Sequence, residues 1–184
     1  MIDLETLDTK SSAVILSIGA VAFDEENFLG EFYTVVNTES CVSAGLTISE
    51  STQNFWEEQA KNNIEAAKIL DMSELEITPT ISSALLLLSN FCNQYPDVKV
   101  WGNGASFDNA ILAYAYTSMS MDIPWMFFND RCYRTINSIY KDVSKSGFIG
   151  VKHNALDDAK NQAVHLLAIN KQHPEILRGV GESF

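Results

Sequence analysis

The pattern of hydrophobic and polar positions predicts strands near the amino terminus and helices from about residue 49 onward. Residues 13–23 form an apolar run rich in Val and Ile, which predicts a buried strand, and residues 31–37 predict a second strand. The turn composition of the segment between them predicts a β-hairpin. Residues 2–5, 98–102 and 124–128 predict three further short strands.

Apolar positions with a helical repeat fill most of the later chain. We predict helices over residues 50–70, 79–95, 106–116, 131–143 and 155–170. Thr78 is the expected N-cap of the second helix, with Pro79 at its first position, and Asn154 is the expected N-cap of the last. The packed stripe of the last helix comprises Ala155, Ala159, Ala163, Leu166 and Leu167. Strands that come early and then alternate with helices predict an α/β fold around one mixed sheet.

The composition, with 46% hydrophobic and 20% charged residues, predicts a single globular domain over residues 1–184. The apolar runs are shorter than the roughly 20 residues that cross a bilayer, so we expect no membrane association and a cytoplasmic location. Cys41, Cys92 and Cys132 are widely separated, which favours reduced thiols over a zinc site or a disulfide.

The formal net charge of -12 argues against a nucleic-acid partner, because such partners are usually bound through Lys and Arg. A cluster of acidic metal ligands would change this balance. Two divalent cations bound by four carboxylates would leave a neutral cleft and a protein of net charge -8. The acidic charge therefore excludes nucleic acid only if the protein binds no metal.

The first candidate site residues are Asp3 and Glu5 in the segment "DLET". Alternate residues of a strand share one face, so both carboxylates would point the same way while Ile2 and Leu4 enter the core. Two carboxylates so close to a terminus are, by themselves, most often a solvated edge. A metal site becomes the better interpretation of Asp3 and Glu5 only if further acidic residues of the chain can join them.

Asp108 and the pair His153 and Asp158 are those further residues. Asp108 follows an apolar strand and a Gly turn, in the first turn of a predicted helix, where it could equally complement the helix dipole. Asp158 offers a hard oxygen ligand, and the imidazole of His153 titrates near neutral pH and can accept a proton. Asp157 points elsewhere around the helix and can serve the helix start. His165 and His173 are expected to be structural or exposed.

Taken together, three segments resemble the motifs of the DEDDh 3′–5′ exonucleases, which are proofreading-type nucleases of the ribonuclease H-like superfamily. The segments are "DLET" with Asp3, Glu5 and Thr6, "SFD" with Asp108, and "HNALDD" with the H-x-A-x-x-D pattern from His153 to Asp158. The segments "STQNFWEEQ", "WGNGASFDNAIL" and "RCYRTI" resemble a phage and bacterial subgroup of exodeoxyribonucleases and small exoribonucleases. The resemblance covers residues 3 to about 169. It implies a ribonuclease H-like fold with a mixed five-stranded sheet flanked by helices.

The resemblance also implies a mechanism. Asp3, Glu5, Asp108 and Asp158 would hold two divalent cations, Mg²⁺ or Mn²⁺, roughly 3.5–4 Å apart, and His153 would be the general base. The protein would hydrolyse single-stranded DNA or RNA from a free 3′ end and release nucleoside 5′-monophosphates. Whether the substrate is DNA or RNA stays open, because no motif specifies a pocket for the 2′-hydroxyl.

The predicted substrate contacts are the backbone from Leu4 to Thr6 and the side chains of Trp56 and Phe107. Trp56 could stack on a base or belong to the core of its helix, and the spacing of Phe107 also suits burial. Arg131 and Arg134 could bind phosphate or pair with carboxylates. A homodimer is possible, but the sequence shows no interface.

Two other functions fit parts of the sequence. The protein could bind 3′ ends without cleaving them, or it could be an acidic mimic of nucleic acid that blocks a basic partner. Neither explains why D-x-E-T and H-x-A-x-x-D occur together. The family pattern normally has several apolar residues before the first Asp, so we expect a shortened reading frame with residues upstream of Met1 missing. If Met1 is the true start, the first strand is clipped and we expect Asp3 to be loosely held.

Overall fold

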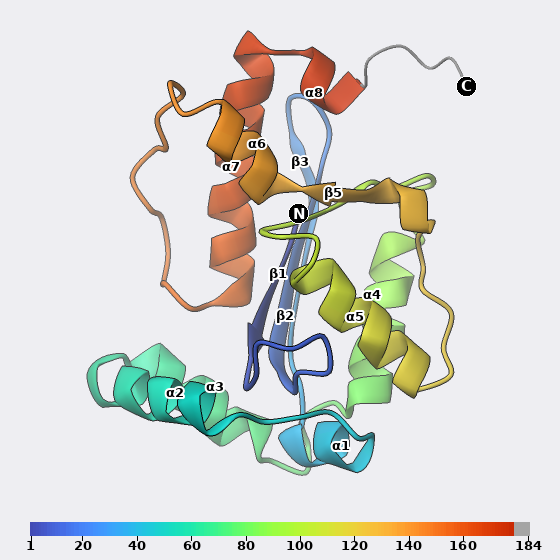
Figure 1. Ribbon diagram of the computed structural model, residues 1–184, viewed down its shortest axis with the longest axis vertical. Helices are drawn as coiled ribbons and strands as arrows, with labels where there is room; N and C mark the ends of the chain where they lie inside the picture. Colours follow the sequence, from blue (N-terminus) through green and yellow to red (C-terminus); the bar gives the residue numbers. More distant parts are fainter. Residues whose placement is uncertain (179–184) are drawn as a thin grey trace.

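The computed structural model describes residues 1–178, and its centre is a five-stranded sheet with the order β3-β2-β1-β4-β5 (Figure 1). The strands are β1 (Ile2–Thr6), β2 (Ile15–Phe23), β3 (Phe28–Val35), β4 (Val100–Gly102) and β5 (Asp130–Cys132). The first three pair antiparallel, whereas β4 lies parallel to β1 and β5 parallel to β4. The sheet is therefore mixed and five-stranded, and the predicted fold class is confirmed.

Helices cover both faces of the sheet and one of its ends (Figure 1). The long helix α7 (Ala155–Gln172) packs on β1 and β2, and α6 (Tyr133–Ile139) lies beside it. The opposite face carries α4 (Ile81–Cys92) and α5 (Asp108–Ser118). The remaining helices are α1 (Thr38–Ser43), α2 (Glu50–Asn62), α3 (Ile64–Ser73) and α8 (Glu175–Arg178), together with the 3-10 turn η1 (Phe127–Asn129).

Side-chain alternation along β1 divides the core into two parts. Ile2 and Leu4 are 4% and 5% exposed and belong to the large cluster that includes Leu85 and Ile111 from α4 and α5. On the other face, Ala159 and its neighbours on α7 pack in a smaller cluster. Asp3 and Glu5 therefore point toward α7, as the alternation predicts.

The structure corrects several predicted element boundaries. The strand predicted at residues 124–128 is wrong, because that segment leads into η1 and the strand begins at Asp130. The N-cap of α4 is Thr80, which accepts a hydrogen bond from Ser83, whereas Thr78 bonds to the Met72 carbonyl. The helix predicted over residues 50–70 is broken at Asn63, whose side chain caps α3. The two helix errors share a cause, because a local polar residue can offer the backbone an alternative hydrogen bond that periodicity does not register.

The predicted cap of the last helix is confirmed. Asn154 caps α7 by accepting hydrogen bonds from the backbone N–H groups of Leu156 and Asp157. Among residues 1–178, no helix is long and apolar enough to span a bilayer.

Candidate active site

The candidate site lies where β1 meets the amino-terminal turns of α5 and α7. Gly19 of β2 makes the approach of α7 possible, because a Cβ on this residue would lie 2.1 Å from the carbonyl carbon of Ala155. The first turn of α7 therefore rests directly on the sheet. This contact places Asp158 against the carboxylates of β1.

Three predicted ligands form one compact group. Carboxylate oxygens of Asp3, Glu5 and Asp158 all lie within 4.8 Å of one another. Asp3 is held by Gln162 of α7, whose side-chain amide donates a hydrogen bond of 2.7 Å to Asp3 Oδ1. The expectation of a loosely held Asp3 is therefore wrong for this structure, in which β1 is paired along its length.

Asp108 lies beside this group rather than within it. It is the first residue of α5 and 2% exposed, and its Oδ1 accepts a hydrogen bond of 3.3 Å from the Leu4 backbone N–H. Its other oxygen, Oδ2, is buried and has no hydrogen-bond partner. A buried carboxylate oxygen without a partner is costly unless a cation or another donor binds it.

Burial dominates the electrostatics of the four carboxyls. It raises the pKa of Asp3 well above the ordinary value, with further contributions from Asp108 and Glu5. Burial and then the charge of Asp158 raise the pKa of Glu5 to about 8. Burial raises the pKa of Asp108 to about 7, and the pKa of Asp158 is also raised by burial. The four groups resist simultaneous ionisation, and bound cations would remove that cost.

This donor set fits hard divalent cations. All four candidate ligands offer carboxylate oxygens, which suit Mg²⁺ or Mn²⁺, and no cysteine belongs to the group found among the described residues. The partnerless Oδ2 of Asp108 is the observation that supports the fit.

His153 stands just before α7 in a left-handed conformation, with a φ of 64°. Its backbone N–H donates a hydrogen bond of 2.9 Å to Asp158 Oδ2, so the two motif residues are joined directly. The imidazole contacts two aromatic rings edge-on, Phe55 at 5.6 Å and Trp56 at 6.1 Å between centroids. Side chains of α2 therefore restrain the ring of His153.

The other predicted contacts have structural partners within the protein. Trp56 is 2% exposed and donates from its indole N–H to the Thr6 carbonyl at 2.9 Å. The Thr6 hydroxyl donates to the Asp8 carbonyl, and Leu4 uses its backbone N–H on Asp108. Phe107 is half-buried against the large core. In this structure these residues brace β1 and α5 around the carboxylates.

Sequence reasoning missed two residues that adjoin the site. Gln162 lies one helical turn after Asp158, a spacing that puts both on one face of α7, but a lone Gln carried no signal. Phe55 is 44% exposed and lies nearer to His153 than Trp56 does. Its only signal was its place in the segment "NFWEEQ".

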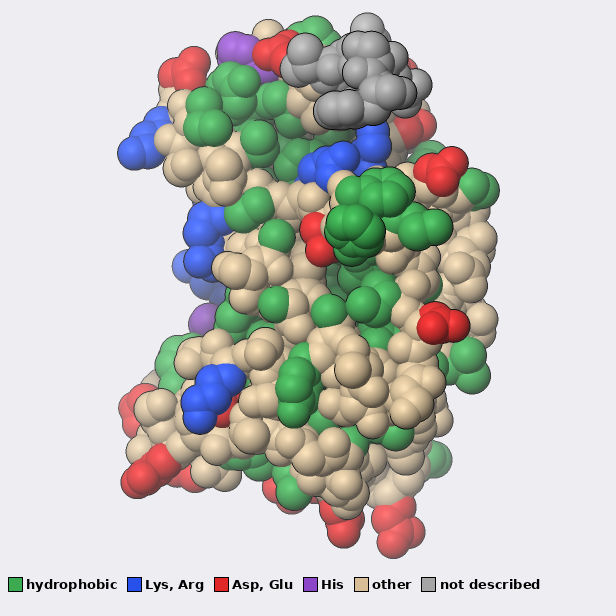
Figure 2. Space-filling view, turned by 45° about the vertical axis from the view of Figure 1, so that its right-hand side comes forward, with side chains coloured by type: hydrophobic (Ala, Val, Ile, Leu, Met, Phe, Trp, Pro, Cys, Tyr) green, Lys and Arg blue, Asp and Glu red, His purple; other side chains and the backbone are tan. Residues whose placement is uncertain are grey.

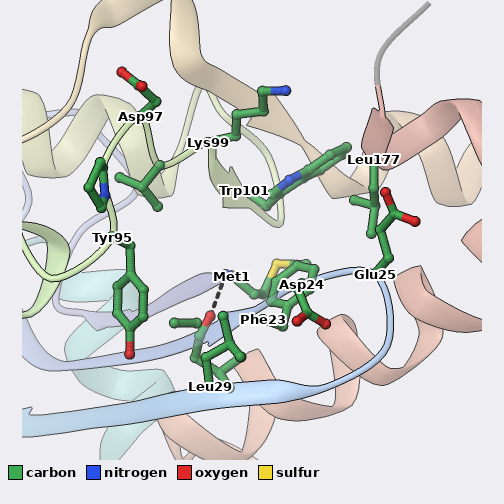
Figure 3. A pocket seen from close by; sticks show the side chains of 14 residues that line it. Met1, Phe23, Asp24, Glu25, Leu29, Tyr95, Asp97, Lys99, Trp101 and Leu177 are labelled. Atoms are coloured by element: carbon green, nitrogen blue, oxygen red, sulfur yellow. Dashed lines mark hydrogen bonds between the residues drawn. The ribbon is translucent and has the colours of Figure 1, made fainter.

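A separate apolar cavity of about 340 Å³ lies near the amino terminus (Figure 3). Trp101, Tyr95, Leu29 and Leu177 point toward it, and the Met1 amino group donates a hydrogen bond to the Val21 carbonyl beside it. None of the predicted site residues lines this cavity. The acidic group, not this pocket, holds the chemistry that the motifs predict.

The mixed sheet, with its acidic residues at β1 and at the starts of α5 and α7, defines an α/β fold of the ribonuclease H-like exonuclease kind. The chain belongs to the 3′-5′ exoribonuclease Rv2179c-like domain family, whose model matches residues 1–170. It is therefore a hydrolase of the 3′-5′ exonuclease class. A comparison with curated proteins gave no match.

Proposed function

We propose that the protein degrades single-stranded RNA from the 3′ end by the chemistry of the DEDDh subgroup and releases nucleoside 5′-monophosphates. The observation that carries this proposal is the convergence of Asp3, Glu5 and Asp158 within 4.8 Å, next to the partnerless oxygen of Asp108. One buried and three partly buried carboxyls with raised pKa values are costly for a fold, and such groups are concentrated at functional sites.

In this proposal Asp3, Glu5, Asp108 and Asp158 hold two Mg²⁺ or Mn²⁺ ions. When bound, such ions neutralise charge at the scissile phosphate and lower the pKa of a bound water. Gln162 donates to Oδ1 of Asp3 and so fixes the orientation of that carboxylate. Leu4 does the same for Asp108 through its backbone N–H.

His153 is the proposed general base. A ring nitrogen takes a proton from the attacking water, and a new bond forms between the water oxygen and phosphorus. The bond from phosphorus to the 3′-oxygen of the preceding nucleotide breaks, and this oxygen takes up a proton from solvent to become the new 3′-hydroxyl. The backbone hydrogen bond to Asp158 and the edge contacts with Phe55 and Trp56 hold the imidazole in one place. Positioning of this kind is a large part of the catalytic effect of a general base.

RNA is favoured over DNA by the family to which the chain belongs. Residues 1–178, which the structure describes, show no contact that would by itself select the 2′-hydroxyl. DNA hydrolysis is therefore tested in the same experiment, as the second possible substrate.

The test compares single-stranded RNA and DNA of one sequence, each labelled at the 3′-terminal nucleotide, with Mn²⁺ or with EDTA. We expect metal-dependent release of labelled mononucleotide, faster from RNA. We expect His153→Ala to lower the rate at least about 100-fold, in line with the loss of a general base. His173→Ala is the matched control, because His173 is partly exposed and pairs with Glu175 outside the site.

Three outcomes separate the alternatives. A folded wild-type protein that releases no nucleotide from either strand would exclude the catalytic proposal. RNA binding without cleavage would indicate a protein that holds 3′ ends, and binding of neither strand would favour the acidic mimic. Faster release from DNA would retain the mechanism and change the substrate.

A further inference from the structure

The segment before β5 exposes an unusual group of large apolar side chains. Met126, Phe127 and Phe128 are 61%, 84% and 62% exposed, and the two phenyl rings meet edge to face with centroids 5.4 Å apart. On the face shown in Figure 2, a raised group of hydrophobic side chains lies directly beside Lys and Arg side chains. Contiguous exposed apolar groups of this kind mark surfaces that contact a partner.

Two arginines connect this aromatic pair with the acidic site. Arg131 donates from Nη1 to the carbonyls of Phe128 and Asp130 at 2.8 and 2.9 Å, which fixes its guanidinium next to the aromatic pair. Arg134 lies over Gly104, since a Cβ built there would be 3.3 Å from the guanidinium carbon. Gly104 belongs to the turn that leads into α5, whose first residue is Asp108. Residues 126–134 are thus a continuous segment that runs from the aromatic pair to the turn before Asp108.

The charge distribution also favours phosphate binding on the side of the molecule that carries β5 and α6. Residues 126–139, which include η1, β5 and α6, contain two basic residues and one acidic residue, a balance of +1 in a chain of net charge -12. Residues 50–76, which form α2 and α3 on the other side of His153, contain seven acidic and two basic residues, a balance of -5. A polyanionic strand leaving the site is repelled by α2 and α3 and attracted toward β5 and α6.

We propose that residues 126–134 bind the part of the RNA strand that lies upstream of its 3′-terminal nucleotide. Phe127 and Phe128 stack against bases, and Arg131 and Arg134 contact phosphates. Aromatic rings interleaved with basic groups are the usual means of binding single strands without regard to sequence. The inference rests on the proposed function and extends it, because it names a second contact surface outside the carboxylate site.

The experiment compares Phe127→Ala/Phe128→Ala with wild type on a diribonucleotide and on an RNA of about ten nucleotides. The diribonucleotide spans only the carboxylate site, whereas the longer strand also reaches the aromatic pair. We expect the ratio of kcat/KM for the long substrate over the short one to fall about tenfold, the effect of losing one stacked base. Ile77→Ala/Ile149→Ala is the matched control, because these side chains are 89% and 76% exposed elsewhere, and its ratio should equal that of wild type.

A second measurement does not depend on hydrolysis. Binding of a fluorescent RNA in EDTA, followed by anisotropy over a range of salt concentrations, should weaken about tenfold in the double variant. In Arg131→Gln the slope of log affinity against log salt should become shallower by about 0.7, the value for one phosphate contact on a single strand.

The outcomes distinguish this inference from the proposed function. If wild type releases no mononucleotide, the proposed function fails, and the anisotropy result alone decides the binding surface. If wild type cleaves RNA but the double variant keeps its length dependence and its affinity, only the surface is overturned. If sedimentation shows that the double variant changes a wild-type dimer into a monomer, with unchanged RNA affinity, the aromatic pair is an interface between copies of the chain and the inference is wrong.

Discussion

At the scale of single residues, the environment of the carboxylates matters as much as their identity. Asp3 is partly buried among other acidic groups, and its carboxylate accepts a hydrogen bond of 2.7 Å from Gln162. The other amide atom of Gln162, Oε1, is buried without a partner. Gln162 is thus committed to the site, in the way that outer residues of metal centres orient the ligands.

We predict that Gln162→Leu lowers exonuclease activity and raises the Mn²⁺ concentration needed for half-maximal activity, each by about 10- to 100-fold. The reason is that Asp3 loses the group that orients it. The control is Gln172→Leu, an exposed position on the same helix. A folded Gln162→Leu protein with unchanged metal dependence would show that the hydrogen bond is only structural.

Residue-scale reasoning from the sequence succeeded where alternation alone decides direction. Ile2 and Leu4 are buried and Asp3 and Glu5 face α7, because a strand can place them in no other way once one face is covered. The same reasoning did not decide whether the ring of Trp56 is buried or stacks on a base. Burial of that ring depends on β1 and the following turn, which lie about 50 residues away in sequence.

At the scale of elements, the contact between β2 and α7 sets the shape of the site. Gly19 touches the first turn of α7 so closely that even a methyl group would overlap the backbone of Ala155 and Leu156. This position requires glycine because of the approach between two elements, not because of its backbone angles.

We predict that Gly19→Ala destabilises the protein by about 2 kcal/mol or more. We also expect it to lower the activity at temperatures at which the variant is still folded. The methyl group must push α7 away from β2, and Asp158 moves with α7. Thermal unfolding and the labelled-RNA assay, both with Mn²⁺, check the two effects. Gly147→Ala is the control, because a Cβ there meets nothing within 4 Å. Wild-type activity in Gly19→Ala would contradict this account of how the elements position Asp158.

The predicted helices were placed well where capping and periodicity agree, as at Asn154 of α7. They were misplaced where two Thr residues compete for one cap, as at Thr78 and Thr80. The strand predicted at residues 124–128 failed because its exposed aromatic residues resemble a buried strand in composition. Composition alone does not report whether a ring faces the core or the solvent.

At the scale of the whole molecule, the protein carries a large acidic excess and concentrates part of it in a group of partly buried carboxyls around Asp3, Glu5 and Asp158. The pKa of Glu5 rises from an ordinary value of 4.5 to about 8 in the fold. A raised pKa means that the folded protein keeps a proton that the unfolded chain has lost. The stability from this group is fully present below about pH 4.5 and is lost as the pH rises through about 8.

We therefore predict that the metal-free protein, in EDTA, melts about 4 °C or more lower at pH 9 than at pH 6. In Glu5→Gln, which carries no charge at either pH, the decrease should be smaller. Mn²⁺ should raise the melting temperature of wild type more at the higher pH, because it binds the ionised carboxylates. Glu57→Gln, on the exposed face of α2, is the control and should melt like wild type at both pH values. A melting temperature that rises from pH 6 to pH 9 in EDTA would contradict the assignment of Glu5.

The sequence by itself determined the parts of this protein that local rules govern. The mixed α/β fold, the common face of Asp3 and Glu5, the place of Asp108 in the first turn of α5 and the cap at Asn154 all follow from alternation, periodicity and capping. These rules act over a few residues and can be read along the chain.

Only the tertiary structure decided which groups surround the carboxylates. The hydrogen bond from Gln162 to Asp3 joins residues that are 159 positions apart in the sequence, and the hydrogen bond from Leu4 to Asp108 joins residues that are 104 positions apart. The contact of Phe55 with His153 likewise depends on how α2 packs against the loop before α7. Such contacts arise when separate elements are packed together at fixed distances, and no spacing within one segment encodes them.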